Sequence, residues 1–127
     1  MPNGDPFSQG QLDEVSRIVT QASRETGLHF SVFVGSVDGS VHDYAERLHA
    51  ALGDVAPDAV LICVAPGERQ VDVVTGRRSA RRLGDRACAL ATLAMTSAFT
   101  GGDLVGGVVN GVRMLADAAG REREPSR

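Results

Sequence analysis

The sequence predicts a small α/β domain with a mixed β-sheet, helices on both faces of the sheet and the element order α-β-α-β-β-α-α. Three observations support this fold class. Residues 59–65 form an uninterrupted apolar run, as expected of a central strand buried on both faces. A Pro-Gly-Glu-Arg turn at 66–69 joins this run to an alternating run at 71–75, which indicates a hairpin. Two helical patterns, at 83–99 and 104–116, follow.

The N-terminal half predicts a helix, a strand and a second helix. Ser8 is a suitable N-cap for a helix whose apolar residues recur every three or four positions, and Gly27 ends that helix. Residues 28–35 alternate as a strand, and a second helix follows at about 42–52. Since this helix connects the strand to the apolar run at 59–65, we expect two parallel strands with a right-handed crossover. The residues expected on the buried face of the second helix are Tyr44, Ala45, Leu48, Ala51 and Leu52.

The C-terminal half predicts two helices rich in alanine and glycine. Asp103 is a suitable N-cap for the last helix. Gly106, Gly107 and Gly111 would let this helix approach its neighbour closely. The residues expected on the buried face of the preceding helix are Leu83, Ala87, Leu90, Ala91, Ala94, Met95 and Ala98.

The length of 127 residues fits one domain. We expect residues 8–120 to form it, with a flexible lead-in at 1–7 and a charged tail at 121–127. All thirteen basic residues are arginine, which excludes a Schiff-base lysine and the lysine of a phosphate-binding loop. Cys63 and Cys88 lie in apolar runs, so we expect buried, reduced thiols.

Charge and hydropathy narrow the class of partner and the compartment. The net charge of −3 gives no reason to expect a nucleic-acid partner. No apolar run approaches the roughly 20 residues of a membrane span, and the first residues lack the basic and apolar segments of a secretory signal. We therefore expect a cytoplasmic protein with an unknown protein partner.

An arginine cluster lies between a predicted strand and a predicted helix. Its members are Arg77, Arg78, Arg81 and Arg82, and the segment 69–86 carries six Arg against two Asp, a net +4. Backbone N–H groups at a helix start together with guanidinium groups favour phosphate or carboxylate. These four residues are thus anion-binding candidates, including for weak contact with an anionic membrane surface. The alternative is a solvated loop whose arginines pair with nearby acidic residues.

No catalytic set can be assigned from the sequence, and no cofactor is expected. Asp38 and Asp103 are weak metal candidates near predicted strand or helix ends, although a turn residue and a helix cap are the simpler interpretations. His42 and His49 could lie near one face of a helix, but a metal site needs three or four convergent ligands. Solvated surface histidines are the interpretation that we favour.

Several motifs occur in an order typical of a known domain. They are Phe7-Ser8, Glu25-Thr26-Gly27-Leu28, Val64-Ala65-Pro66-Gly67-Glu68-Arg69-Gln70-Val71-Asp72-Val73-Val74-Thr75-Gly76, and Ala98-Phe99-Thr100-Gly101-Gly102-Asp103 with Gly106, Gly107 and Gly111. In this order, across roughly residues 7–118, the chain resembles the TPM domain of plant thylakoid-lumen proteins, bacterial envelope proteins and an animal receptor-associated protein. A small uncharacterised actinobacterial branch related to that domain is the expected place of this chain.

The resemblance implies the fold described above and, for some TPM relatives, weak phosphatase activity and divalent-metal binding. Ligands that match those of the relatives are missing here, so neither property is assigned to residues of this chain. We expect a non-enzymatic protein-interaction or accessory module. The alternatives are a weak metal-dependent phosphatase, whose activity substitution of Asp38 or Asp103 would remove, and anion or anionic-membrane binding through the arginines of 77–82.

Overall fold

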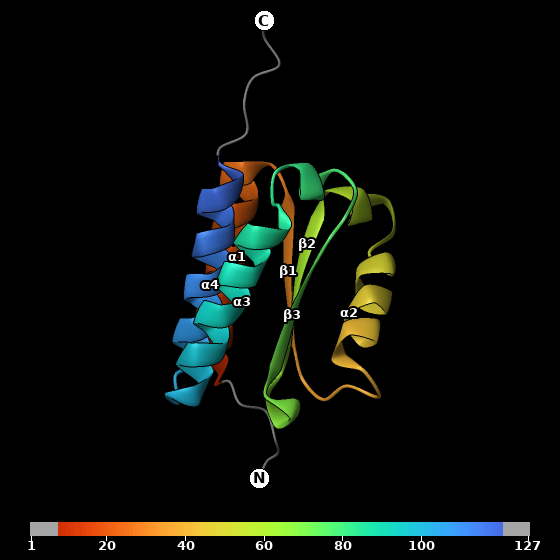
Figure 1. Ribbon diagram of the computed structural model, residues 1–127. Helices are drawn as coiled ribbons and strands as arrows, with labels where there is room; N and C mark the ends of the chain where they lie inside the picture. Colours follow the sequence, from red (N-terminus) through yellow and green to blue (C-terminus); the bar gives the residue numbers. More distant parts are fainter. Residues whose placement is uncertain (1–7, 121–127) are drawn as a thin grey trace, which may run out of the picture.

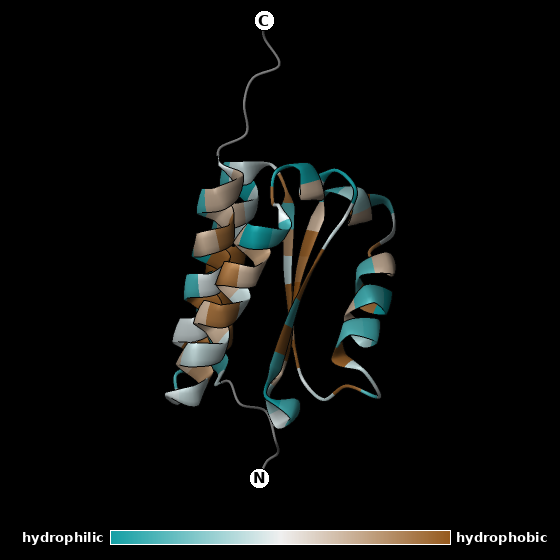
Figure 2. Cartoon of the chain, in the orientation of Figure 1, coloured by the Kyte–Doolittle hydropathy of each residue, from teal (hydrophilic) through white to brown (hydrophobic). Residues whose placement is uncertain are grey.

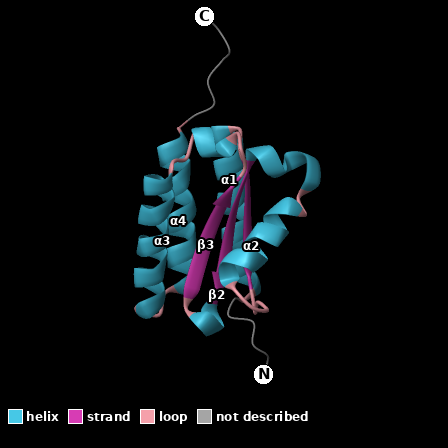
Figure 3. Cartoon of the chain, turned by 45° about the vertical axis from the view of Figure 1, so that its right-hand side comes forward, coloured by secondary structure: helices cyan, strands magenta, loops and turns pink. Residues whose placement is uncertain are grey.

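The structure, a computed structural model, describes residues 8–120 and arranges them in three layers (Figure 1). Helices α1 (Gln9–Thr26), α3 (Asp85–Thr100) and α4 (Leu104–Ala119) cover one face of a β-sheet. Helix α2 (Val41–Ala50) covers the other face, as Figure 3 shows from a second direction. The predicted α/β class, with helices on both faces of a small mixed sheet, is confirmed.

The sheet has three strands in the order β1-β2-β3, namely β1 (His29–Val34), β2 (Ala59–Ala65) and β3 (Gln70–Thr75). Strand β1 runs parallel to β2, and β3 runs antiparallel to β2. The parallel pair and the hairpin are therefore both confirmed. Short 3-10 segments connect the elements: η1 (Gly53–Asp58), η2 (Pro66–Glu68) and η3 (Ser79–Arg81).

Strand β2 is buried along its whole length because both of its faces are covered. Val60 and Ile62 belong to the larger core, which the sheet forms with α1, α3 and α4. Leu61 and Cys63 belong to the smaller core under α2. Apolar residues accordingly line the strands and the inward sides of the helices in Figure 2, whereas the outer side of α2 is polar.

The helix caps and the close helix contact expected from the sequence are present in the structure. Ser8 and the N3 glutamine form a capping box at α1, which ends at Gly27 with φ 78°. Asp103 caps α4 by accepting the N–H of Gly106 at 3.0 Å. A Cβ at Gly107 would lie 2.8 Å from the ring of Phe99, so glycine permits the close approach of α3 and α4.

The predicted burial is wrong for three residues. Leu90 is 48% exposed, because the buried side of α3 is centred on Ala91 and Met95 and Leu90 lies a quarter-turn away. Ala51, expected to be buried, is exposed after the end of α2. His49, expected at the surface, is 8% exposed and its Nε2 lies 3.3 Å from the carbonyl oxygen of Ala59. This contact satisfies a polar atom at the core boundary.

Within residues 8–120, no helix is both long enough and apolar enough to cross a membrane.

Candidate functional site

The carboxyl ends of the parallel strands form the most promising site, at the end of the molecule that lies lowest in Figure 1. The turn η2, the end of α3 and the start of α4 meet there. Two hollows share Arg69 and Thr96 in their walls and together form what we call the carboxyl-end groove. The first hollow measures about 340 Å³. Its walls are Pro66, Arg69, Thr96, Phe99, Thr100, Gly102 and Leu104.

The second hollow continues along the outer edge of β3, which pairs with no further strand within residues 8–120. It measures about 290 Å³ and combines polar and apolar side chains from three elements. Its walls are Val41, His42, Arg69, Gln70, Val71, Asp72 and Thr96. The groove thus connects a hollow of mixed polar and apolar lining to an open strand edge.

Arg69 has an unusual backbone. With φ 56° and ψ 41° it is the one non-glycine residue of positive φ among the described residues. A left-handed conformation costs a bulky residue roughly 1–2 kcal/mol. The N–H of Arg69 donates to the carbonyl of Pro66 at 3.1 Å, which closes the turn. The tight η2 turn imposes the conformation, and it places the Arg69 side chain in the walls of both hollows.

Arg69 has no carboxylate partner within the described part of the chain. The ion pairs there join His42 to Glu46 and to Asp72, and Arg78 to Asp58. A guanidinium is a cation with five N–H donors and no acceptor, so the Arg69 side chain is suited to an anionic group.

A ladder of threonine hydroxyls runs along α3 toward the groove. Thr92 donates to the carbonyl of Cys88 at 2.8 Å, Thr96 to that of Thr92 at 2.6 Å, and Thr100 to that of Thr96 at 3.1 Å. Each hydroxyl proton is therefore committed to the backbone one turn earlier. The oxygens of Thr96 and Thr100 can accept a hydrogen bond from a ligand but have no proton to donate.

His42 connects α2 to the edge strand. Its Nδ1 lies 2.8 Å from a carboxylate oxygen of Asp72, and its Nε2 lies 3.5 Å from one of Glu46. The hydrogen bond and the charge of Asp72 raise the pKa of His42, and Glu46 adds to the effect. His42 and His49 do not share a site, because His49 points into the core boundary.

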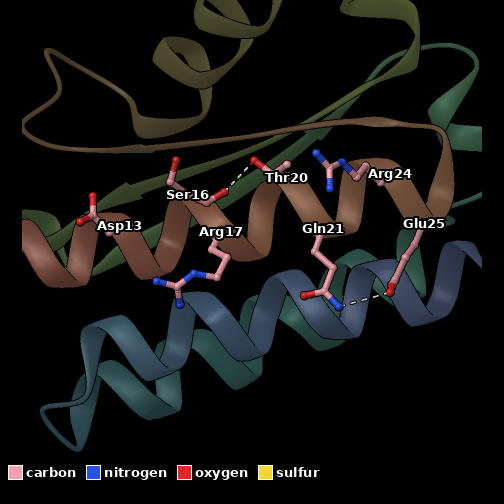
Figure 4. Close-up of a pocket in the computed structure, with 7 residues that line it drawn as sticks. All are labelled: Asp13, Ser16, Arg17, Thr20, Gln21, Arg24 and Glu25. Atoms are coloured by element: carbon pink, nitrogen blue, oxygen red, sulfur yellow. Dashed lines mark hydrogen bonds between the residues drawn. The ribbon is translucent and has the colours of Figure 1, made fainter.

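A larger hollow lies on the outer side of α1, but it is a shallow surface that is open to solvent. It measures about 860 Å³ and is lined by residues of α1 alone. Figure 4 shows that Arg17 and Gln21 point toward α4, whereas Ser16 and Thr20 point to the opposite side of the helix. Gln21 donates to Glu25 at 3.3 Å, a contact within the same helix. These side chains diverge, so we do not assign a site here.

The arginines of 77–82 lie at the opposite end of β2, and the structure divides them into two pairs. Arg78 binds Asp58 in a two-pronged ion pair at 2.8 and 2.7 Å, which lowers the pKa of Asp58. Arg82 donates to the carbonyl oxygens of Ala119 and Gly120 at the end of α4. Arg77 and Arg81 are exposed and form no ion pair within residues 8–120.

The metal candidates do not converge with other ligands. Asp38 is exposed in the loop after β1, and the carboxylate of Asp103 accepts the N–H of Gly106. Residues 8–120 contain no cluster of three His, Cys, Asp or Glu side chains suited to a metal ion. A cation held by either carboxylate would need ligands from beyond that range or from water.

Both cysteines are free thiols of low reactivity. Cys63 is fully buried and Cys88 is half-buried. Burial raises the pKa of each thiol, and at Cys63 the charge of Asp72 adds to the effect. The protonated thiol is a poor nucleophile, so these groups suit packing rather than covalent catalysis.

The carboxyl-end groove can bind an apolar group and an anion side by side. Arg69 supplies charge and donors, the threonine oxygens supply acceptors, and Pro66, Phe99 and Leu104 supply apolar surface. The sequence prediction missed this groove, although the Pro-Gly-Glu-Arg turn and the glycine-rich segment after Phe99 that build it stand out in the sequence.

Comparison with known proteins identifies the family. The family described as "Domain of unknown function (DUF5130)" matches residues 1–116, and the chain belongs to it. The uncharacterized proteins Rv2468c and MT2543 of two Mycobacterium tuberculosis strains are each 33% identical over 113 residues, 87% of this chain. The chain spans 66% of the length of these relatives. The match is to DUF5130, and the relationship to the TPM domain stays a prediction.

Solved structures of similar fold come from three bacteria. The BA42 protein of Bizionia argentinensis has a TM-score of 0.84 at 15% identity, covering 97% of this chain and 90% of that one. The N-terminal domain of a P. gingivalis protein has a TM-score of 0.76 at 19% identity, covering 88% and 75%. The N-terminal domain of cg2496 from Corynebacterium glutamicum has a TM-score of 0.74 at 16% identity, covering 94% and 78%. At these identities the likeness shows the fold alone.

Proposed function

We propose that this DUF5130 domain is a non-enzymatic interaction module that receives an extended segment of a partner protein in the carboxyl-end groove. The observation that carries the proposal is Arg69, which has a strained backbone and whose guanidinium, without an ion pair among residues 8–120, lines both the first hollow and the open edge of β3. Strained non-glycine residues persist where the surrounding structure enforces them, and they cluster at ligand-binding sites.

The chemistry of the groove favours binding over turnover. The guanidinium of Arg69 offers hydrogen-bond donors and no acceptor, and the hydroxyl of Thr96 donates to a backbone carbonyl at 2.6 Å. The open edge of β3 offers main-chain groups to an extended peptide, and the adjoining hollows offer places for its side chains.

A selection of peptides from a random library on the full chain tests this proposal. The library presents each segment both with a free C-terminus and embedded between flanking residues. We expect selected peptides to shift the amide NMR signals of Arg69, Thr96 and Phe99. Leu104→Arg, which places a charge and bulk in the first hollow, should abolish their binding.

Leu93→Arg is the matched control, because Leu93 is 64% exposed on α3 and does not line the groove. It should leave binding intact. Circular dichroism should show that both variants are folded. A selection that yields no peptide with this pattern overturns the proposal.

A second proposal rests on Arg77 and Arg81, which form no ion pair within residues 8–120 and could attract an anionic surface. The double variant Arg77→Gln and Arg81→Gln leaves the bonded pair Arg78 and Arg82 in place. Co-sedimentation with phosphatidylserine vesicles should fall in this variant and in high salt. Equal sedimentation of variant and parent would count against a role of this end in membrane contact.

We also propose that the family is related to the TPM domain. Two of the motifs that carry the resemblance, the turn at Pro66–Glu68 and the segment from Ala98 to Asp103, meet at the carboxyl-end groove. A phosphatase function inherited through that relationship would appear as chelator-sensitive hydrolysis of p-nitrophenyl phosphate. Such activity should be lost in Asp38→Asn or Asp103→Asn. If the wild-type chain lacks the activity, the proposed relationship is limited to the fold.

A further inference from the structure

We infer that the first hollow of the carboxyl-end groove captures the free C-terminal carboxylate of a peptide whose last residue is apolar. This inference rests on the proposed interaction function and names the kind of segment that the groove receives. It is argued from charge complementarity, from the hydrogen-bonding state of the threonines and from the shape of the groove.

Charge complementarity identifies the anionic group. The guanidinium of Arg69 is a cationic group without a carboxylate partner among residues 8–120. A guanidinium offers a planar pair of N–H donors that matches a carboxylate. Because the hollow that Arg69 lines also has Pro66, Phe99 and Leu104 in its walls, the matching ligand joins a carboxylate directly to an apolar group.

The threonines identify the second polar group of the ligand. The hydroxyl protons of Thr96 and Thr100 bond to carbonyl oxygens of α3, so both side-chain oxygens are left as acceptors. A ligand must therefore supply an N–H donor close to its carboxylate. The last residue of a peptide has this arrangement, because its amide N–H and its carboxylate are attached to the same Cα atom.

The walls of the first hollow identify the side chain. Pro66, Phe99 and Leu104 present apolar surface, and a volume of about 340 Å³ lies at the lower end of the range for small-ligand sites. This is room for one terminal residue rather than for a folded element. An aliphatic or aromatic side chain would gain burial there, whereas an acidic one would lose hydration while Arg69 is engaged by the terminal carboxylate.

The second hollow fixes the direction of the peptide. It begins at Arg69 and follows Gln70, Val71 and Asp72 along the unpaired edge of β3. With the carboxylate at Arg69, the preceding residues of the peptide would run along this edge and add main-chain hydrogen bonds. The site therefore binds the C-terminus of a peptide together with the short extended segment that precedes it.

Three acetylated tetrapeptides test the inference by NMR titration of the full chain. The first ends in leucine with a free carboxylate, the second is the same peptide as a C-terminal amide, and the third ends in aspartate. We expect the first to shift signals of Arg69, Thr96 and Phe99 and to bind at least about tenfold more tightly than the other two, because each lacks one part of the match.

Arg69→Asn removes the guanidinium and keeps a residue that tolerates positive φ. It should reduce the preference for the free carboxylate over the amide to about twofold or less. Arg113→Asn, at an exposed position of α4 outside the groove, should leave the preference unchanged. Thr96→Val should weaken binding of the first peptide but leave the preference for the free carboxylate over the amide unchanged.

The outcomes separate the two levels of the argument. Equal binding of acid and amide at the groove would overturn the C-terminal inference and leave the interaction module standing. A preference that survives Arg69→Asn would also overturn the inference. No shift at the groove with these peptides, together with a failed library selection, would remove both proposals.

Discussion

Four arginines lie at the amino end of β2 and one, Arg69, lies at its carboxyl end, and their side chains have different environments. At the amino end, Arg78 and Arg82 bond to groups of the chain itself. At the carboxyl end, Arg69 is held by its backbone while its guanidinium has no ion pair within residues 8–120. Arg78 and Arg82 therefore stabilise the fold at the amino end, whereas Arg69, like the exposed Arg77 and Arg81, forms no ion pair within residues 8–120.

The largest expected effect lies at the amino end, at Gly76. A Cβ there would overlap the carbonyl oxygen of Ala56 and lie 2.6 Å from that of Pro57. Since both obstacles are backbone atoms, Gly76→Ala should lower the free energy of unfolding by about 3 kcal/mol, measured by urea denaturation. Gly10→Ala, with open space around its Cβ, should change it by less than about 1 kcal/mol. Equal effects would remove the structural assignment of this end.

Ser79 should produce the next largest effect. Its side chain is fully buried, and its Oγ donates to the carbonyl of Ala59 and accepts the N–H of Gly76, both at 2.8 Å. Ser79→Ala should therefore cost about 2 kcal/mol of unfolding free energy. The exposed Ser16→Ala should stay within about 0.5 kcal/mol of the parent. A neutral Ser79→Ala would show that β2 does not depend on this bond network.

Substitution of Arg69 should stabilise the fold, in contrast to the substitutions of Gly76 and Ser79. Arg69→Asn relieves part of the left-handed strain, so it should raise the free energy of unfolding by about 0.5 kcal/mol. The same exchange at Arg113, inside α4, should lower stability slightly because asparagine is the poorer helix former. Denaturation of both variants in one series makes the comparison. A clear loss of stability in Arg69→Asn would mean that this arginine, too, is structural.

The smallest effect is the pH dependence of the contact between His42 and Asp72. The folded-state pKa of His42 is raised, so protonated His42 binds the fold more strongly than neutral His42 does. Its contribution should be complete below the ordinary histidine pKa of about 6.5 and should disappear as pH rises through the elevated value. The stability difference between wild type and His42→Gln should accordingly shrink as the pH rises from below about 6.5 through the raised pKa of His42.

Asp72→Asn is the control for this titration. It removes the main cause of the shift, so the NMR-measured pKa of His42 should fall toward the ordinary value in this variant. An unchanged pKa would contradict the assigned cause.

Most of the fold could be predicted, because its signals are local. The apolar run of β2, the capping Ser8 and the helix-ending Gly27 each act within a few residues. Position on a helix surface was harder: α3 is apolar on several sides, so spacing alone placed Leu90 in the core although it is 48% exposed. His49 shows the converse, since its burial depends on a carbonyl oxygen ten residues away.

The candidate site was harder to predict, because its parts come from separate segments. A sequence shows that Arg69 follows a turn, but not that its backbone is left-handed or that Phe99 and Leu104 lie beside it. The partners of Arg78 and Arg82 are likewise distant in the chain, at Asp58 and at the end of α4. A run of arginines therefore predicts charge, whereas tertiary contacts decide which of them remain available.

The threonine ladder of α3 has a consequence for evolution of the domain. Hydroxyls that bond to the carbonyl one turn earlier tend to bend a helix. Thr92 belongs to the ladder but touches neither hollow, whereas Thr96, one turn on, forms a wall of both. Substitution of Thr92 would thus alter the curvature of α3 and the width of the carboxyl-end groove, while every residue that lines the groove stays the same.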